Sequence, residues 1–378
     1  MTGGAFDDNY YGYGGDDVIS GRGGDDYLSG GDGSDTLNGD EGNDRLDGGA
    51  SGDVLNGGVG DDQLWGRAGT DILNGGDGND NLYGGTGGDV LIGGAGWDTA
   101  RYDNATAGVD ARLYNAALNT GEAAGDTYSG IEQLVGSYNS DVLYGDGNNN
   151  VIAGLGGDDY LDGVGGALNY LFGGDGNDQV FARSGVDIVD GGNGFDYVRY
   201  DYADAGVQAY LYDATLNTGW AAADTYASIE GLVGSGFADD LRGNNSGNVL
   251  IGLGGNDFIV GSGGVDIMNG GTGVDTFFYA NANDGGGAGD IIQDFVSGTD
   301  RIMLSGGAFG LGSPGGAPID AYRFVYGANA TLATIQVGYD TSTGEVWYDF
   351  NGTGFGGRVT LAYLFGGPSM VAGDILVL

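Results

Sequence analysis

The sequence contains no cysteine, no histidine and no lysine, so all eleven basic residues are arginine. The lack of cysteine excludes disulfide bridges and thiolate chemistry. The lack of histidine excludes Ser-His-Asp and Cys-His catalysis and the HExxH zinc proteases, and the lack of lysine excludes a Walker A loop and Schiff-base chemistry. We therefore expect that the protein is not an enzyme.

Long apolar runs and positive charge are also scarce. No stretch of about 18 apolar residues occurs, so no membrane span is expected. The N-terminal segment MTGGAFDDNYYGYGGDD has neither a basic start nor an apolar core, and we expect no cleaved Sec-type signal. The formal net charge of −43 excludes nucleic acid and anionic membranes as expected partners, because phosphate is repelled, and it favours cations.

Glycine and aspartate are abundant and recur with a fixed period. The chain has 88 Gly in 378 residues, and 49 of its 54 acidic residues are Asp. Residues 75–83 read GGDGNDNLY and residues 84–92 read GGTGGDVLI, which defines the unit G-G-x-G-x-D-x-U-x with U apolar. A fixed period of this kind predicts a solenoid, whereas a disordered Gly-rich linker would not keep Asp and Leu in phase. In the first block the Asp position falls on Asp17, Asp26, Asp35, Asp44, Asp53, Asp62, Asp71, Asp80, Asp89 and Asp98, and U falls on Ile19, Leu28, Leu37, Leu46, Leu55, Leu64, Leu73, Leu82, Leu91 and Ala100.

The rhythm stops after Asp98 and returns twice. The second block has one extra residue between Asp159 and Asn169. Asn150 and Asn169 keep a carbonyl oxygen but lose the charge, so metal sites at these positions should be weaker or absent. The Asp position reads Asp141, Asn150, Asp159, Asn169, Asp178, Asp187 and Asp196 in the second block, and Asp239, Asn248, Asp257, Asp266 and Asp275 in the third.

The repeated unit resembles the calcium-binding nonapeptide of the RTX, or haemolysin-type, repeat family. The resemblance implies an all-β fold, a right-handed parallel β-roll in which two units form an 18-residue coil and each unit is a Gly-rich turn followed by a three-residue strand. It also implies that the aspartates of the three blocks bind Ca²⁺, which prefers carboxylate and carbonyl oxygens. Each Asp should stack over the Asp 18 residues later, and one ion per adjacent pair gives up to about 16 Ca²⁺ ions.

The two interruptions are copies of one another. Residues 101–114 read RYDNATAGVDARLY and residues 199–212 read RYDYADAGVQAYLY, at an ungapped offset of 98. Their alternating apolar residues predict strands with one buried face. The inserts either only pack between coils or hold a ligand near the tyrosines and tryptophan that cluster there: Tyr102, Tyr114, Tyr200, Tyr212 and Trp220. No partner is evident from the sequence for Glu122, Glu132, Glu230 and Glu345.

The last hundred residues differ in character from the repeats. Residues 275–306, DTFFYANANDGGGAGDIIQDFVSGTDRIMLSG, and the terminal DILVL resemble the C-terminal segment of RTX proteins exported by type I secretion. Residues 334–354, TIQVGYDTSTGEVWYDFNGTG, predict a hairpin with TSTG as its turn. The same region could cap the end of the solenoid, and one segment can serve both purposes.

The sequence therefore divides into seven predicted parts. These are a short lead (1–11), the first RTX block (12–100), a β insert (101–140), the second block (141–198), a second copy of the insert (199–238), the third block (239–279), and a C-terminal β-rich cap with the type I secretion signal (280–378). The leading hypothesis is a secreted structural protein that folds on Ca²⁺ outside the cell and forms a homo-polymer, as a surface layer, filament or matrix. Its other expected partner is the type I secretion machinery. The alternative is a soluble, calcium-dependent adhesive module that binds a cell-surface glycan.

Overall fold

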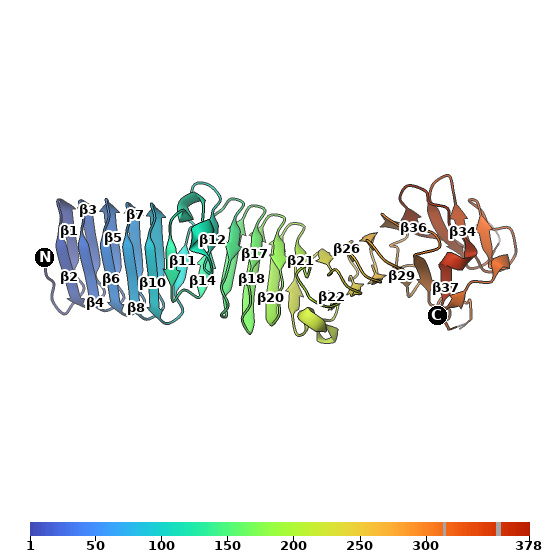
Figure 1. The fold of residues 1–378 in the computed structure, drawn as a ribbon, viewed down its shortest axis with the longest axis horizontal. Coiled ribbons are helices and arrows are strands. Elements are labelled where there is room, and N and C mark those ends of the chain that lie inside the picture. Colours follow the sequence, from blue (N-terminus) through green and yellow to red (C-terminus); the bar gives the residue numbers. More distant parts are fainter. Residues whose placement is uncertain (313–314, 353–356) are drawn as a thin grey trace. The chain divides into compact units, whose positions relative to one another are not determined.

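The computed structural model describes residues 1–312, 315–352 and 357–378, which form two compact units. The first unit comprises residues 1–181 and 187–196, and the second comprises residues 182–186 and 197–378. Both consist of β-strands joined by turns and a few short 3-10 helices (Figure 1). None of the described helices has the length and apolar character needed to cross a membrane.

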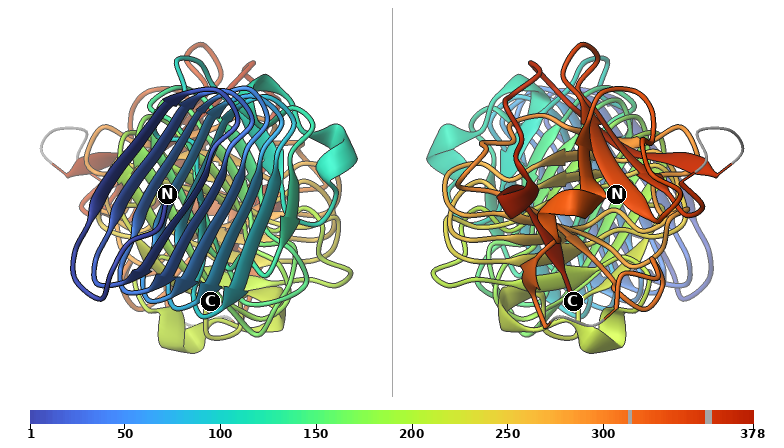
Figure 2. Two further views of the ribbon diagram at one scale, coloured as in Figure 1. Left: turned by 90° about the vertical axis from the view of Figure 1, so that its left-hand side faces the viewer. Right: turned by 90° about the vertical axis from the view of Figure 1, so that its right-hand side faces the viewer.

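The first unit is a parallel β-roll in which successive strands alternate between sheets. The left view of Figure 2 shows its first strands stacked in parallel. One sheet has the order β1 (Asn9–Gly14), β3 (Tyr27–Asp32), β5 (Arg45–Ala50), β7 (Gln63–Ala68), β9 (Asn81–Thr86), β11 (Thr99–Arg101), β14 (Gln133–Val135), β16 (Val151–Gly156), β18 (Leu168–Asp175) and β20 (Val186–Asn193). The others contain β2 (Val18–Gly23), β4 (Thr36–Glu41), β6 (Val54–Val59), β8 (Ile72–Asp77), β10 (Val90–Ala95) and β13 (Thr127–Ser129), and then β12 (Asp110–Arg112), β15 (Val142–Tyr144), β17 (Tyr160–Asp162) and β19 (Gln179–Phe181).

The repeat period sets both the core and the strand register. The U residues from Ile19 to Leu82 are fully buried, so the predicted apolar row is the core of the roll. Burying one such side chain contributes about 1.5–3 kcal/mol. Leu28 pairs with Leu46, one coil later. The all-β parallel roll predicted from the sequence is therefore confirmed.

Two details differ from the expected coil. Strands β1 to β10 have six residues rather than three, because parallel pairing continues through the Gly-Gly pair, as between Gly31 and Gly49. The extra residue of the second block is absorbed between β17 and β18, so Val151 pairs with Tyr170. The roll therefore continues across the insertion without losing its stacking.

The two inserts fold alike. In the first, β12 is followed by η1 (Ala116–Leu118) and η2 (Gly121–Ala123); in the second, β22 (Gln208–Tyr210) is followed by η3 (Ala214–Leu216) and η4 (Gly219–Ala221). Ala111 and Ala209 are fully buried, as the alternation predicted. The sequence duplication is thus a structural duplication.

The second unit continues with parallel strands and ends in an antiparallel region. One sheet contains β21 (Tyr197–Arg199), β24 (Gly231–Val233), β26 (Val249–Ile251), β28 (Ile267–Asn269), β30 (Asp290–Ile292), β36 (Arg358–Leu364), β35 (Glu345–Asp349), β34 (Gln336–Asp340) and β33 (Phe324–Tyr326). Another contains β22, β25 (Asp240–Arg242), β27 (Phe258–Val260), β29 (Thr276–Tyr279), β31 (Arg301–Leu304), β37 (Ile375–Val377) and β32 (Ala317–Pro318). The remaining elements are β23 (Thr225–Ala227), η5 (Ala321–Arg323) and η6 (Ala372–Asp374).

The predicted C-terminal hairpin is confirmed. Strands β34 and β35 are antiparallel and are joined at residues 341–344. Residues 353–354 of the predicted segment lie outside the described residues. The terminal strand β37 pairs with β31, and its Ile375 and Val377 are almost fully buried, so the apolar tail is part of the folded unit.

Candidate metal centres

The aspartates of the repeats form a hydrogen-bonded ladder along each edge of the roll. The backbone N–H of Asp44 donates to Oδ1 of Asp62 (2.7 Å), and the N–H of Asp62 donates to Oδ1 of Asp80 (2.8 Å). On the other edge, Asp53 donates in the same way to Asp71 (2.8 Å). Both edges repeat with the predicted separation of 18 residues, and each carboxylate uses one oxygen to join two coils.

The second carboxylate oxygen has no hydrogen-bond donor among the residues that the structure describes. A buried, ionised oxygen without a partner is costly, and such atoms are rare in folded proteins. Their regular recurrence makes them candidate ligands of a cation. The oxygens in question are Oδ2 of Asp26, Asp35, Asp44, Asp53, Asp62, Asp71, Asp80, Asp89, Asp98, Asp159, Asp178, Asp257 and Asp266.

Most of the unpartnered oxygens lie beside a backbone carbonyl of the next coil. A Cβ added to Gly39 would lie 2.2 Å from Oδ2 of Asp44 and 2.5 Å from the carbonyl oxygen of Gly57, in the next coil. A Cβ added to Gly57 would meet Oδ2 of Asp62 and the carbonyl of Gly75 in the same way. Carboxylate and carbonyl oxygens thus converge where any side chain would intrude, which explains the glycine of the motif. This oxygen-only set fits Ca²⁺.

Burial raises the pKa of the ladder carboxyls. Burial is the largest cause, opposed by the hydrogen bond from the previous coil and reinforced by neighbouring carboxylates, and it raises the pKa of Asp62 and Asp71 to about 7. The pKa of Asp159 rises to about 8 for the same reasons. Without a cation, the roll therefore opposes ionisation of its own carboxyls, and a bound divalent cation would remove that penalty.

The candidate sites depend on two side chains and several carbonyls. Among the described residues, no group of three or more Asp, Glu, His or Cys side chains is placed to hold a metal ion. Side chains of the described residues therefore do not form a complete metal site by themselves. The backbone supplies the remaining oxygens, so the turn conformation is as important as the aspartates.

The second block departs from the regular ladder at its asparagines. Asn169 turns its amide toward the cradle, where Nδ2 donates to the carbonyl of Gly165 (2.7 Å) and to Oδ1 of Asp187 (2.9 Å). A Cβ added to Gly163 would lie 2.6 Å from this Nδ2, so a hydrogen-bond donor stands where most other coils place a carboxylate oxygen. Asn150 instead accepts from the N–H of Asp146 (2.9 Å). The other edge of the second block is uninterrupted, because Asp141 donates to Asp159, Asp159 to Asp178 and Asp178 to Asp196 (2.8 Å each).

The aspartates that open the second and third blocks are held by serines. Oδ2 of Asp141 accepts from the N–H of Ser137 (2.5 Å), and its Oδ1 accepts from the Ser137 hydroxyl (2.9 Å). Asp239 receives the same two bonds from Ser235. Asp141 and Asp239 still donate their N–H groups to the aspartate of the next coil, as Asp239 does to Asp257 (2.9 Å), so they belong to the ladder. Unlike the aspartates with an unpartnered Oδ2, each has hydrogen-bond donors from the chain at both carboxylate oxygens.

The ladder also includes residues that the sequence reading missed. They share one property, which is that each is joined to a ladder aspartate by a hydrogen bond between a backbone N–H and a carboxylate, although they lie outside the repeats or before the first repeat unit. Asp8 precedes Asp26 on its edge and donates to its Oδ1 (2.6 Å). The others are Asp126, Glu132, Asp290 and Asp300, which accept from Asp89, Asp98, Asp266 and Asp275, respectively. The first insert changes the separation from 18 to 34 or 37 residues, and the start of the C-terminal region changes it to 24 or 25, so these positions do not follow the repeat period.

The aromatic cluster of the inserts is not a ligand surface as a whole. Tyr102 and Tyr200 are buried, and their hydroxyls donate to Oδ2 of Asp126 and Asp224 (2.7 Å each). Tyr114 is exposed, as are Tyr212 and to a lesser degree Trp220. The buried tyrosines therefore complete the ladder instead of facing solvent.

Two of the glutamates for which the sequence suggested no partner do have one. Glu132 accepts from the N–H of Asp98 (3.0 Å). Glu345 pairs with Arg358 and accepts from the hydroxyl of Thr360 (2.6 Å). The first is part of the ladder and the second is part of the C-terminal sheet.

Comparison with known families matches this chain to the model described as the RTX calcium-binding nonapeptide repeat. The matched stretches cover more than half of the chain: residues 2–37, 38–73, 74–103, 135–167, 164–198 and 242–277. A comparison with curated proteins finds no match. RTX nonapeptide repeats bind Ca²⁺, and the many repeats here imply several ions. The chain belongs to the family of RTX calcium-binding nonapeptide repeat proteins.

Proposed function

We propose that this protein is a secreted structural protein that folds when it binds Ca²⁺ outside the cell and then assembles with copies of itself into a surface layer, filament or matrix. RTX repeats are typical of secreted proteins. The observation that carries the proposal is the pair of ladders whose buried carboxylate oxygens have no donor among the described residues. A fold of this kind depends on cations for its stability.

The first step of the proposed function is folding on calcium. Without ions, stacked carboxylates such as Asp62 and Asp80 repel one another while the glycine-rich turns lose entropy on ordering. Metal binding supplies folding free energy directly when no site exists in the unfolded chain. Extracellular calcium modules bind at about 10⁻⁴–10⁻³ M, so the chain would stay open in the cytosol and fold outside the cell.

Export by type I secretion fits the same sequence of events. The C-terminal strands β36 and β37 are part of the second unit, where Ile375 is fully buried. A signal in this tail would be accessible before folding and hidden afterwards. Deletion of residues 358–378 should therefore keep the chain inside the cell, while the first unit still binds calcium. Normal export of the shortened chain would contradict this assignment.

The second step is assembly. The formal charge of −43 keeps metal-free chains apart, and about 16 bound ions would cancel most of it. Large apolar side chains then remain exposed, among them Tyr138 (71% exposed) in the first unit and Phe365 (74%) in the second. Exposed aromatic side chains of this kind favour contacts between molecules once the repulsion is removed. We further propose that the repeats themselves are the functional product and that the protein is not an enzyme.

Negative-stain electron microscopy and light scattering, in 10 mM CaCl₂ and in 10 mM MgCl₂, test the assembly. We expect ordered polymers in calcium only. The variant Tyr138→Ser should fold with calcium as the wild type does and assemble less well, since only an exposed contact is removed. A wild-type protein that stays monomeric in calcium at every concentration would replace this proposal with the alternative below.

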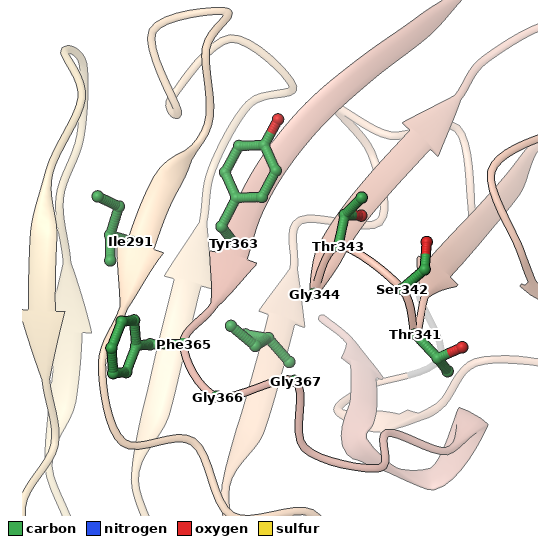
Figure 3. Close-up of a pocket in the computed structure, with 10 residues that line it drawn as sticks. Ile291, Thr341, Ser342, Thr343, Gly344, Tyr363, Phe365, Gly366 and Gly367 are labelled. Atoms are coloured by element: carbon green, nitrogen blue, oxygen red, sulfur yellow. The ribbon is translucent and has the colours of Figure 1, made fainter.

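The alternative is a soluble module that binds glycans, and one hollow favours it. The space, about 490 Å³, lies in the second unit (Figure 3). The rings of Tyr363 and Phe365 line it together with the hydroxyls of Thr341, Ser342 and Thr343, which belong to the β34–β35 turn. Aromatic faces beside hydroxyl groups suit a neutral sugar ring.

A glycan array in calcium tests this alternative. The variant Phe365→Ala should abolish glycan binding. The control Phe350→Ala should leave glycan binding unchanged, because it removes an exposed phenyl ring (54% exposed) that does not line the hollow. Equal binding by both variants would exclude this hollow as a glycan site.

A further inference from the structure

The first block of nonapeptides ends near Asp98, but the row of unpartnered carboxylate oxygens includes this last aspartate. Asp98 is fully buried, and its Oδ2 has no hydrogen-bond donor among the residues that the structure describes. In preceding coils of this edge, as at Asp44 and Asp62, the equivalent oxygen lies beside a glycine carbonyl of the next coil. Here the chain leaves the repeat pattern, so the next coil must be built by the insert.

The insert supplies the missing carbonyl. A Cβ added to Gly93 would lie 2.6 Å from Oδ2 of Asp98 and 1.9 Å from the carbonyl oxygen of Gly130. This is the arrangement that Gly57, Asp62 and the Gly75 carbonyl form within the repeats. Gly130 therefore takes the place of a repeat glycine.

The insert also supplies the second carboxylate. Oε2 of Glu132 accepts from the N–H of Asp98 (3.0 Å), as the next aspartate does elsewhere in the ladder. Strand β14 then pairs with β11, with Gln133 opposite Thr99, so the insert forms a true next coil. The longer side chain of glutamate reaches the ladder position from a segment that does not follow the nonapeptide spacing.

The opposite edge of the same coil ends in a different way. Asp89 donates its N–H to Oδ1 of Asp126 (2.9 Å), and Oδ2 of Asp126 accepts from the buried Tyr102 hydroxyl (2.7 Å). A donor from the chain thus partners that final carboxylate. On the Asp98 edge, the ladder ends in a second carboxylate and an unpartnered oxygen.

We propose that Asp98, Glu132 and the carbonyl of Gly130 hold a further Ca²⁺ ion outside the nonapeptide repeats. The site rests on the calcium-binding role of the repeats and extends the array of ions into the first insert. The ion joins the end of the first block to the insert. Trp97 borders the site, because it lines a surface hollow together with Glu132. The indole therefore lies near enough to report on the ion by energy transfer.

Two measurements on the full chain test the site, namely calcium stoichiometry by equilibrium dialysis and tryptophan-sensitised Tb³⁺ luminescence. Glu132→Gln should lower the stoichiometry by about one ion per chain, because one carboxylate ligand is lost. It should also reduce the Tb³⁺ emission, and in a Trp97→Phe background it should change the emission no further. The matched control is Glu122→Gln, which removes a charge from the same insert but from no ladder position, and should change neither quantity.

The outcomes separate this site from the rest of the array. Glu132→Gln protein that binds as many ions as the wild type, with unchanged emission, would overturn the proposed site. If Glu132→Gln impairs folding, Glu132→Asp serves in its place, because it keeps the charge but has a shorter side chain. This variant should bind the last ion less tightly while its circular dichroism signal matches that of the wild type. Unchanged affinity for that ion would overturn the site as well. Wild-type protein that takes up no calcium at all would instead overturn the calcium-binding role of the repeats.

Discussion

Replacing Asp62 with asparagine should have opposite effects on stability with and without calcium. Asp62 is fully buried and lies between Asp44 and Asp80 on its edge, so it borders two candidate sites. Asparagine keeps an oxygen that can accept the N–H of Asp44 but removes the charge. The neighbouring Asp61 is exposed, so Asp61→Asn is a matched control with the same change in charge.

The expected magnitudes follow from the two sites and from the pKa. With a dissociation constant of about 10⁻⁴ M and 10 mM calcium, each site stabilises the fold by about 2.7 kcal/mol, so the loss of two sites costs about 5 kcal/mol. Without calcium, the raised pKa of Asp62, about 7 against an ordinary 3.8, means that its ionised form destabilises the fold by about 4 kcal/mol at pH 8. Asparagine removes this penalty.

Guanidinium unfolding in 10 mM calcium and far-UV circular dichroism in chelator measure the two effects. We expect Asp62→Asn to be less stable than Asp61→Asn in calcium, to bind about two fewer ions, and to retain more strand signal in chelator. Equal stability and equal stoichiometry of the two variants in calcium would refute the reasoning that each ladder aspartate is shared between two ions.

Three further predictions concern the exceptions to the ladder and its response to pH. Asn169→Asp should add about one bound Ca²⁺ per chain, because the amide that donates to Asp187 is replaced by a carboxylate; unchanged stoichiometry by equilibrium dialysis would contradict this. Tyr102→Phe should lower the free energy of unfolding in saturating calcium by about 1–3 kcal/mol, since Asp126 loses its donor, while the exposed Tyr114→Phe should have little effect in the same thermal melts. In chelator, strand signal should be strongest near pH 4 and fall as the pH rises through about 6 to 8, because the buried carboxyls have a raised pKa and bind protons more tightly in the folded chain; a signal that grows with pH would reverse the assigned sign.

The regular part of the fold could be predicted because one physical requirement repeats every nine residues. Leu64 must be buried and Asp62 must face the edge in each coil, so their phase alone predicts the core and the ladder. The predicted stacking of repeats and the all-β class follow from that phase. The six-residue strands could not be read in the same way, because pairing through the glycines depends on the register of neighbouring coils.

The exceptions could not be predicted because they depend on the path of the chain between coils. Glu132 joins the ladder only because the insert returns to the edge 34 residues after Asp98. In the sequence, Tyr102 belongs to a cluster of aromatic residues that could face a ligand. In the structure, its hydroxyl instead donates to the buried carboxylate of Asp126 in the same insert. The orientation of the Asn169 amide is likewise set by its hydrogen bonds and not by its place in the repeat.

The most direct test of the calcium-dependent fold is a calcium titration of the metal-free protein followed by far-UV circular dichroism, with magnesium as the control. The unpartnered carboxylate oxygens of the two ladders predict a chain that is largely unfolded in chelator, gains strand signal cooperatively with calcium between about 10⁻⁴ and 10⁻³ M, and does not respond to magnesium. A chain with the same strand signal in chelator as in calcium would contradict the account.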